Sequence, residues 1–413
     1  MKRLLLGKDF TPLTTCLIFF LFVTLFGDKY AHSQPVRGVT DDTIKVGVVI
    51  AMTGPGASTL LPYQEAFKNY FRHINEQGGI HSRKVKLIIE DDRFTIPAAI
   101  AAYKKLVYKD RVLAILGMGG SGQHKALYDR IENDKVPVIA AAWSHHVTRP
   151  LKRYSFQPTN DNIDEIKMIV EYIAKNTIKE KLRLAYVYVD VETAKSGLEQ
   201  LEESVKHYGL ELLTQEVHNL GDMDVTPQVM RLKKKKINHI IALSGGPGFF
   251  ALFRDSRKFG YSPVVISSLH LMGEDTVRVV REAARNLYGI SCVASWYDNE
   301  PEIAKMREIT LRYHPESKEP NYVENFGSHR YHSKGWLGAM IFTEGAKKAG
   351  KDLNHETLVA GFEKIKDFDT RGLSGPISFG PNRRKANDCG KFYKADVEKN
   401  RFVPISGWVR PAH

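Results

Sequence analysis

The sequence predicts an α/β protein built from two doubly wound parallel sheets. Short apolar runs alternate with longer segments of helical periodicity through almost the whole chain, which is the pattern of βαβ units. The chain of 413 residues exceeds the usual size of one domain, and its 43% hydrophobic and 26% charged residues can fill more than one core. One parallel sheet holding all of the expected strands would be unusually large, which favours two sheets.

The first group of elements runs to residue 141. Strands are expected at residues 44–50, 85–90, 113–116 and 136–141, and helices at 97–109 and 123–131. The helix after the first strand should end at Gly78-Gly79, because glycine terminates helices. Pro97 opens the next helix from its first turn, where the missing amide proton costs nothing.

The second group begins after Pro158 and follows the same plan. Its expected strands are 184–189, 210–217, 240–243, 264–266 and 289–295, with helices at 161–175, 194–208, 249–259 and 276–284. Helices at 302–312, 334–348 and 355–365 come next, then a strand at 376–380 and a hairpin of 391–397 with 401–405. No low-complexity linker separates the two groups, so short crossovers should join them.

Residues 1–33 have the parts of a secretory signal peptide. Lys2, Arg3 and Lys8 form a basic region, and residues 13–26 are mainly apolar. Ala31 and Ser33, before Gln34, are small residues at the two positions that a signal peptidase reads. The apolar stretch is short for a transmembrane helix, and no later segment is long enough to span a bilayer. We therefore expect a soluble, exported, periplasmic chain that is cut near Ser33 and has no stable membrane insertion.

The net charge and the cysteines exclude several classes of partner and site. The formal charge of +13 comes from 60 Lys and Arg against 47 Asp and Glu spread along the chain, so we expect no nucleic-acid partner. The densest run, residues 233–236, stands where cations complement a helix C-terminus, with a phosphate-binding patch as the alternative. The three cysteines lack zinc-site spacing, and after export Cys292 and Cys389 could form a disulfide that spacing alone cannot establish.

Residues 117–122, Gly-Met-Gly-Gly-Ser-Gly, fit a dinucleotide-binding pattern between a strand and a helix. They follow the third strand rather than the first, and no acid stands about 20 residues further on to bind a ribose. We therefore expect no cofactor here. The glycines would instead let a small anion reach free amides at the helix start, with Ser121 adding a hydroxyl; a ligand-free turn is the alternative.

A second candidate segment ends the next strand. Ala142 and Ser144 are small and expose backbone amides, and Trp143 between them could cover a ligand. His145 and His146 would point in opposite directions, which argues against a metal site, and no nucleophile motif supports catalysis. Trp336, at the start of the helix at 334–348, is either a core residue or a ligand contact.

The order of several short motifs resembles the type I periplasmic solute-binding proteins of the branched-chain amino acid (leucine/isoleucine/valine) ABC transporter family. The motifs are Ile44-Lys45-Val46-Gly47, Thr53-Gly54-Pro55, Gly78-Gly79-Ile80, Glu90-Asp91-Asp92, Val136-Pro137-Val138-Ile139 and Leu373-Ser374-Gly375-Pro376-Ile377-Ser378-Phe379. The resemblance implies two lobes joined by a hinge of three crossovers, with solute closed between them. Lobe one would hold residues 36–155 and 292–372, and lobe two residues 156–291 and 373–413.

The resemblance also implies site residues. Ser121 would take the ligand carboxylate, Ala142, Trp143 and Ser144 would form the adjoining wall, and lobe two would contribute Thr193, Ser268, Leu269 and His270. The family's acid for an ammonium group should follow the strand at 264–266, but no carboxylate stands there. Burying an unpaired ammonium is costly, so we expect a carboxylate or amide without an amino group, unless Glu192 or Glu274 replaces the acid.

These expectations combine into an exported solute-binding protein whose partners are a small solute and the permease subunits of an ABC importer. A periplasmic sensor with the same lobes is the alternative of a different class. An exported α/β enzyme is a third hypothesis, although no catalytic motif supports it.

Overall fold

The computed structural model describes residues 36–243, 245–314 and 330–412. The expected signal peptide lies outside these residues. Met1–Val36 and Arg37–His413 are separate units, and only the second is described below.

The first sheet has five parallel strands in the order β2-β1-β3-β4-β5. The strands are β1 (Thr43–Ile50), β2 (Lys84–Asp91), β3 (Ala114–Gly117), β4 (Val138–Ala140) and β5 (Ser155–Phe156). Strand β2 lies on one side of β1 and strand β3 on the other. The connections that leave β1 and β3 therefore run to opposite faces and diverge at the sheet's carboxyl edge. Such a divergence is where open α/β sheets bind ligands.

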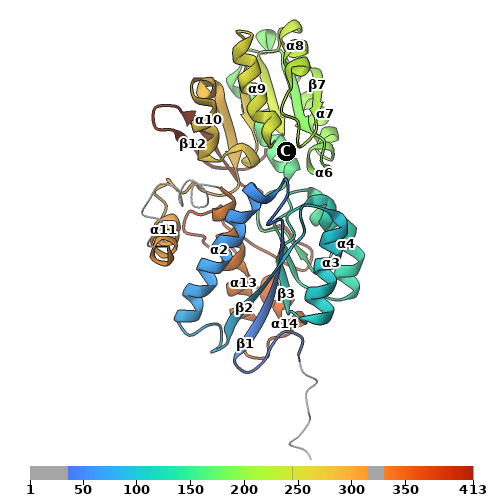
Figure 1. Cartoon of the computed structure of the whole chain (residues 1–413), viewed down its shortest axis with the longest axis vertical. Coiled ribbons are helices and arrows are strands. Elements are labelled where there is room, and N and C mark those ends of the chain that lie inside the picture. Colours follow the sequence, from blue (N-terminus) through green and yellow to red (C-terminus); the bar gives the residue numbers. More distant parts are fainter. Residues whose placement is uncertain (1–35, 244, 315–329, 413) are drawn as a thin grey trace, which may run out of the picture. The chain divides into compact units, whose positions relative to one another are not determined.

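Helices cover both faces of this sheet, as Figure 1 shows. Helices α2 (Ala57–Glu76) and α13 (Arg330–Ala349) pack together on one face, and α14 (His355–Glu363) packs against α13. Helices α3 (Ile96–Lys104) and α4 (Ser121–Asn133) cover the other face, and α11 (Pro301–Tyr313) contacts α2. Because both faces are covered, β1 is a nearly continuous apolar run rather than an alternating one.

The second sheet has seven strands in the order β12-β11-β10-β9-β8-β6-β7. The strands are β6 (Leu184–Val189), β7 (Leu212–His218), β8 (His239–Leu243), β9 (Val264–Ser267), β10 (Leu287–Ser291), β11 (Gly390–Asp396) and β12 (Arg401–Val409). The five strands from β7 to β10 are parallel and repeat the order of the first sheet, while β11 and β12 add an antiparallel hairpin. The expected fold class, two doubly wound lobes, is confirmed.

Alternate side chains of β6 belong to two different cores. Leu184 and Tyr186 join a cluster with α5 (Asn162–Asn176) and α7 (Leu198–His207). Ala185 and Val187 join the opposite cluster, which includes residues of α8 (Thr226–Lys234), α9 (Pro247–Lys258) and α10 (Glu274–Val280). This sheet is therefore also buried on both faces, which explains why its strands could be recognised as apolar runs.

Several expected elements differ from the observed ones. The strand expected at 289–295 is β10, which ends at Ser291, and the helix expected at 276–284 is α10 followed by a 3-10 helix from Arg281 to Asn286. The helix expected at 194–208 is two helices, α6 (Glu192–Lys195) and α7, separated by Ser196 and Gly197. A Cβ on Gly197 would lie 2.4 Å from Ile166 Cδ1, so a larger residue would not fit there without a shift. The strand expected at 376–380 is absent from the sheets that the described residues form. Ile377 and Gly380 make only isolated bridges, to Phe368 and Arg383.

The segment after residue 373 packs with the first lobe. Leu373, Ile377, Phe379 and Ala386 all lie in the core built around the first sheet. The sequence-based lobe boundary at 373 placed them in lobe two. The chain crosses to the second sheet only between Ala386 and the start of β11.

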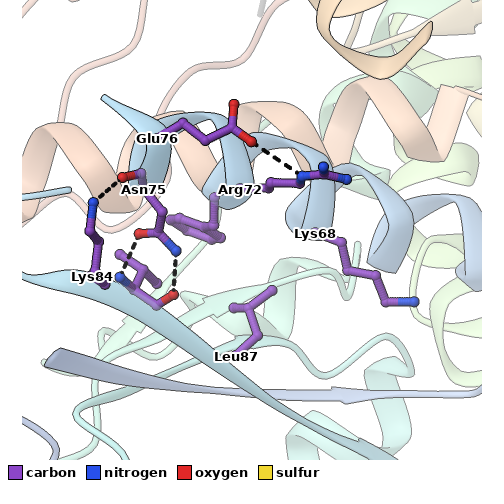
Figure 2. A pocket seen from close by; sticks show the side chains of 8 residues that line it. Lys68, Arg72, Asn75, Glu76, Lys84 and Leu87 are labelled. Atoms are coloured by element: carbon purple, nitrogen blue, oxygen red, sulfur yellow. Dashed lines mark hydrogen bonds and ion pairs between the residues drawn. The ribbon is translucent and has the colours of Figure 1, made fainter. Parts of the chain in front are cut away.

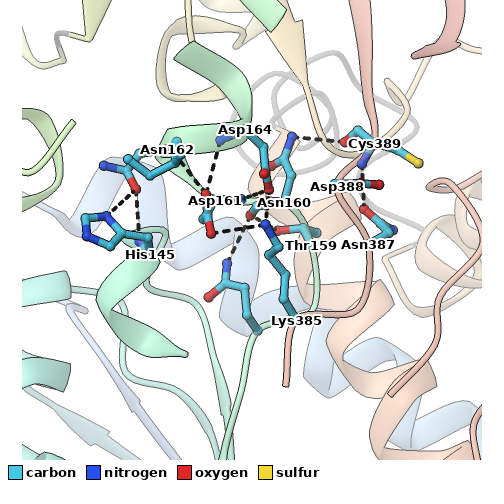
Figure 3. Close-up of polar contacts among 12 residues, drawn as sticks. His145, Thr159, Asn160, Asp161, Asn162, Asp164, Lys385, Asn387, Asp388 and Cys389 are labelled. Carbon is cyan, nitrogen blue, oxygen red and sulfur yellow. Dashed lines mark hydrogen bonds and ion pairs between the residues drawn. The ribbon is translucent and has the colours of Figure 1, made fainter. Parts of the chain in front are cut away.

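The chain passes between the sheets first in the segment between β5 and α5 and last in the segment before β11. A polar network, drawn in Figure 3, holds these two crossovers together. Lys385 Nζ lies 3.3 Å from Asp161 Oδ2 and 2.5 Å from Asp164 Oδ2. Asp161 also caps α5 by accepting the amide protons of Ile163 and Asp164. Burial, and then the neighbouring Asp161 carboxylate, raise the pKa of Asp164 to about 6.

The two cysteines of the described chain do not form the disulfide that the sequence left open. Cys292 and Cys389 are both buried free thiols. Cys292 belongs to the core of the first lobe. Cys389 Sγ instead accepts a hydrogen bond from Arg410 Nε at 3.4 Å, and its carbonyl accepts one from Asn160.

Candidate ligand-binding site

A cavity of about 830 Å³ lies at the carboxyl ends of strands from both sheets. Lobe one contributes the start of α2 and the loops after β3 and β4, and lobe two contributes the loops after β6, β8 and β9. Both sheets therefore present their topological switch points to one space, as the shared strand order predicts. The lining residues used below are Leu60, Leu61, Phe94, Ser121, Trp143, Glu192, Thr193, Leu220, Phe250, Ser268, His270, Asp275, Arg278 and Tyr331.

Ser121 is the first residue of α4 and lines the cavity. The N-cap residue, Gly120, supplies no side-chain hydrogen bond, so the first amides of this 13-residue helix keep their donors for other acceptors. Thr193 Oγ1 donates to Ser121 Oγ at 2.7 Å from the opposite lobe. A hydroxyl has one proton and two lone pairs, so Ser121 can accept this bond and still donate to an anion.

The glycines before Ser121 can be explained by the backbone and its neighbours, without a ligand. Gly117 has a φ of +97°, and a Cβ there would lie 2.7 Å from Val49 O. A Cβ on Gly119 would lie 2.7 Å from Leu60 Cδ1. Backbone conformation and packing therefore require Gly117, and a larger residue at Gly119 would have to displace the end of the Leu60 side chain. The glycine pattern thus carries less information about an anion than the sequence suggested.

Aromatic rings from both lobes meet at the cavity. The Trp143 and His270 ring centroids are 4.7 Å apart, and those of His270 and Tyr331 are 5.9 Å apart. Trp143 Nε1 donates to Asn160 Oδ1 at 3.4 Å, and His270 Nδ1 lies 3.0 Å from Ser268 Oγ. Trp143 and Tyr331 are only 2% and 4% exposed, so their orientation is fixed by packing.

The acids considered as substitutes for the missing carboxylate differ in their positions. Glu192 lines the cavity, and its Oε1 lies 3.2 Å from His146 Nε2 and 3.7 Å from Lys125 Nζ. Glu274 does not line it. The Glu274 carboxylate accepts hydrogen bonds from Ser295 Oγ at 2.9 Å and from the Phe402 amide at 2.6 Å, and burial raises its pKa to about 7.

Of the nine predicted ligand residues, the cavity brings together five: Ser121, Trp143, Thr193, Ser268 and His270. The other four pack elsewhere. Ala142 lies in a small core cluster and Leu269 in the core of lobe one. Ser144 Oγ lies 3.4 Å from Ser196 Oγ, behind the lining.

Trp336 is a core residue rather than a cavity residue. It is fully buried, its Nε1 donates to Glu302 Oε1 at 3.0 Å, and its ring meets that of Tyr70 edge-on at 4.9 Å. Sequence reasoning missed Phe94 and Leu220, which follow the ends of β2 and β7. The rule that ligands lie beyond strand ends could have pointed to both.

A second hollow, of about 550 Å³, lies between α2 and β2 and is shown in Figure 2. Its polar groups have partners within the hollow or beside it, and Lys68 Nζ lies 3.3 Å from Glu65 Oε2. Arg72 Nε lies 3.3 Å from Glu76 Oε1, the Asn75 side chain bonds both backbone groups of Val85, and Lys84 donates to the Asn75 carbonyl. We assign no ligand to this hollow.

Comparison with known proteins identifies the family. A model of the periplasmic binding protein family matches residues 43–401. The chain belongs to the periplasmic binding protein family. This family consists of solute-binding proteins.

This periplasmic binding protein has distant curated relatives. It is 25% identical to the Leu/Ile/Val/Thr-binding protein of Salmonella typhimurium, over 57% of this chain and 64% of that protein. It is 23% identical to the Leu/Ile/Val-binding protein of Escherichia coli K12, over 53% of this chain and 59% of that protein. The matches thus span less than two thirds of these relatives.

Solved structures share its fold. The fatty acid ABC transporter substrate-binding protein from Thermomonospora curvata has a TM-score of 0.81 at 24% identity, covering 91% of this chain and 95% of that one. A branched-chain amino acid ABC transporter protein from Thermus thermophilus with bound valine has a TM-score of 0.82 at 18% identity, covering 91% and 98%. A solute-binding protein from Rhodopseudomonas palustris BisB5 with 3,4-dihydroxybenzoic acid has a TM-score of 0.77 at 20% identity, covering 90% and 99%.

The described part of this periplasmic binding protein offers no candidate for a membrane-spanning helix or a metal site. Within residues 36–243, 245–314 and 330–412, no helix is long and apolar enough to cross a bilayer. In the same ranges, no group of three or more His, Cys, Asp or Glu side chains is arranged to hold a metal ion.

Proposed function

We propose that this periplasmic binding protein captures a small organic solute with a carboxylate or amide group between its lobes and delivers it to an ABC importer. The observation that carries the proposal is the cavity at the switch points of both sheets, with Ser121 at the start of α4 facing Thr193 of the other lobe. The ligands named for three structural neighbours, a fatty acid, valine and 3,4-dihydroxybenzoic acid, share a carboxylate.

The cavity's charges favour a solute without an ammonium group. An α-amino acid needs a carboxylate partner close to the site that holds its own carboxylate. Two carboxylates, Glu192 and Asp275, line the cavity. Glu192 already faces Lys125 and His146 of lobe one. Asp275 precedes Arg278, which also lines the cavity, by three residues on α10, the spacing of neighbouring side chains on a helix. Ser268 and His270 stand where an acid would be needed and supply none. A neutral or anionic head group avoids the cost of burying an unpaired ammonium.

The rest of the cavity suits an apolar body. Leu60, Leu61 and Phe94 come from lobe one, and Leu220 and Phe250 from lobe two. Burying apolar solute surface against such residues is favourable at about 25 cal/mol per Å². The volume of about 830 Å³ lies within the usual range for drug-sized ligands, so a ring or a branched or extended chain would fit.

The proposal also covers export, recognition by the importer and the boundaries of the lobes. The chain would be exported, cut near Ser33 and recognised in its closed form by permease subunits, with no catalytic activity. Lobe one would hold residues 36–155 and 292 onward, and the third crossover would lie after Ala386, because residues 373–386 pack in the lobe-one core.

A thermal-shift screen tests the function. The exported protein is heated with amino acids, aliphatic acids, aromatic acids and their amides, because a ligand that binds only the native state raises the melting temperature. We expect a dose-dependent rise with at least one non-amino acid or amide, and recovery of that compound unchanged by mass spectrometry. A compound that is converted would instead support the enzyme hypothesis.

A further inference from the structure

A cluster of polar side chains, two of them charged, lies on one rim of the cavity and joins the lobes through α6. Glu192, on α6 of lobe two, has its Oε1 3.2 Å from His146 Nε2 and 3.7 Å from Lys125 Nζ. Lys125 belongs to α4 and His146 to the turn after β4, both in lobe one. The acid therefore lies between two groups of the opposite lobe.

Neutral contacts surround this ion-pair cluster. Asn162, at the start of α5, donates to the Thr193 carbonyl at 2.9 Å and to Ser196 Oγ at 3.1 Å. Its Oδ1 accepts the His145 amide proton at 2.9 Å, and Ser144 Oγ lies 3.4 Å from Ser196 Oγ. One asparagine thus holds both α6 and the lobe-one turn that carries His146.

Helix α6 is a short element whose position depends on these contacts. It has four residues, and Ser196 and Gly197 separate it from α7. A continuous helix would fix α6 through the packing of α7 against α5, but the break at Gly197 removes that constraint. The same four residues carry Thr193, which donates to Ser121.

We infer that Lys125, His146 and Glu192 form an inter-lobe latch that stabilises the closed arrangement and holds Thr193 against Ser121. Lys125 and His146 do not line the cavity, so they are positioning residues that act through α6. The inference rests on the proposed function, because a latch matters only where two lobes open and close on a solute.

The attraction between the latch residues is limited by how far their side chains are exposed to solvent. The side chains of Lys125, His146 and Glu192 are 51%, 30% and 27% exposed, so solvent and salt weaken their attraction. Such a latch biases the lobes toward closure without preventing release. Its removal should lower the ratio of closed to open molecules about two- to five-fold, the size of a partly exposed ion pair.

The test measures the distance between the lobes without any solute. Spin labels are placed on the exposed positions Asp129 of lobe one and Met223 of lobe two through Asp129→Cys and Met223→Cys, while Cys292 and Cys389 stay buried. Pulsed dipolar spectroscopy should show Lys125→Met shifting the distribution to longer distances. Lys104→Met, which removes an exposed cation from α3, is the matched control and should leave it unchanged.

Two further measurements separate a latch from a general structural effect. Lys125→Met should add little to Glu192→Gln, since both remove the same pair. Raising the salt concentration should shift the wild type more than the Lys125→Met variant. Identical distributions in wild type, Lys125→Met and Glu192→Gln would overturn the latch. Because no solute is used, this result is independent of whether the thermal-shift screen finds a ligand.

Discussion

Thr193 donates its hydroxyl proton to Ser121 Oγ across 2.7 Å, linking α6 of lobe two to the first residue of α4 in lobe one. The bond occupies one lone pair of Ser121 and leaves its proton for another acceptor. When the Ser121 hydroxyl oxygen accepts the proton of Thr193, the O–H bond of Ser121 becomes more polar. Ser121 is then a stronger hydrogen-bond donor. The residue predicted to bind the solute is thus prepared for an anion by the opposite lobe.

Ser121→Ala should weaken solute binding while leaving the melting temperature of the solute-free protein nearly unchanged. The lost bond to a charged group should cost about 1.5 to 3 kcal/mol, or roughly 10- to 150-fold in affinity. Titration calorimetry with the strongest compound from the screen measures this. Wild-type affinity in Ser121→Ala would remove Ser121 from the site.

Thr193→Val should produce a smaller loss. Valine keeps the shape of threonine but cannot donate to Ser121, and a neutral hydrogen bond contributes about 0.5 to 1.5 kcal/mol. We expect affinity to fall about 2- to 10-fold in calorimetry. Thr193→Ser, which keeps the hydroxyl, is the control and should retain most of the affinity. Wild-type affinity in Thr193→Val, or a loss confined to Thr193→Ser, would show that the methyl contact matters and the hydroxyl does not.

Leucine, isoleucine and valine should bind at least ten times more weakly than the best non-amino carboxylic acid or amide, a gap of about 1.4 kcal/mol. The reason is that Ser268 and His270, not a carboxylate, stand in the cavity directly after β9, and that both acids lining the cavity have cationic or imidazole side chains nearby. Glu192 faces Lys125 and His146, and Asp275 precedes Arg278 by three residues on α10. Competition calorimetry compares the two classes. Micromolar binding of leucine would contradict this, and its loss in Glu192→Gln would identify Glu192 as the substitute acid.

Stability should fall as the pH rises from about 4.5 to about 7, in part through Glu274. Burial raises its pKa from 4.5 to about 7, so over this range the folded protein keeps a proton that the unfolded chain has released. One such group lowers the free energy of unfolding by up to about 1.4 kcal/mol per pH unit. Glu274→Gln removes this contribution.

Urea unfolding at pH 5, 6, 7 and 8 provides the measurement for Glu274. The difference between wild type and Glu274→Gln should change between pH 5 and 7 and then level off. Glu282→Gln, at an exposed position just after α10, is the control and should show no such change. A constant difference across the range would show that Glu274 is already ionised at pH 5.

The fold could be predicted from the sequence because both sheets are buried on two faces. Strands such as β1 and β8 then become continuous apolar runs between helices of clear periodicity. The break between α6 and α7 was not predicted, because the sequence does not show that Gly197 lies close to Ile166, a residue of a different helix. Residues 373–386 were assigned to the wrong core for the same reason, since sequence does not show which neighbour a loop packs against.

The site was predictable only where strand ends determine it. Ser121 and Trp143 follow β3 and β4, and both line the cavity. Trp336 was a poor candidate because helical periodicity shows that a face is buried but not what covers it. Lys125 gave no signal in the sequence, and His146 was weighed only as a metal ligand, because their partner Glu192 lies in the other lobe.

Closure of the two lobes on a solute can be measured by small-angle X-ray scattering of the exported protein. The radius of gyration is measured without solute and with a saturating amount of the compound that gives the largest thermal shift. Closure of a hinge brings two similar masses together, so we predict a smaller radius at saturation. The same compound should have a weaker effect on Ser121→Ala at equal concentration. A wild-type scattering curve that stays unchanged at saturation would contradict capture between the lobes.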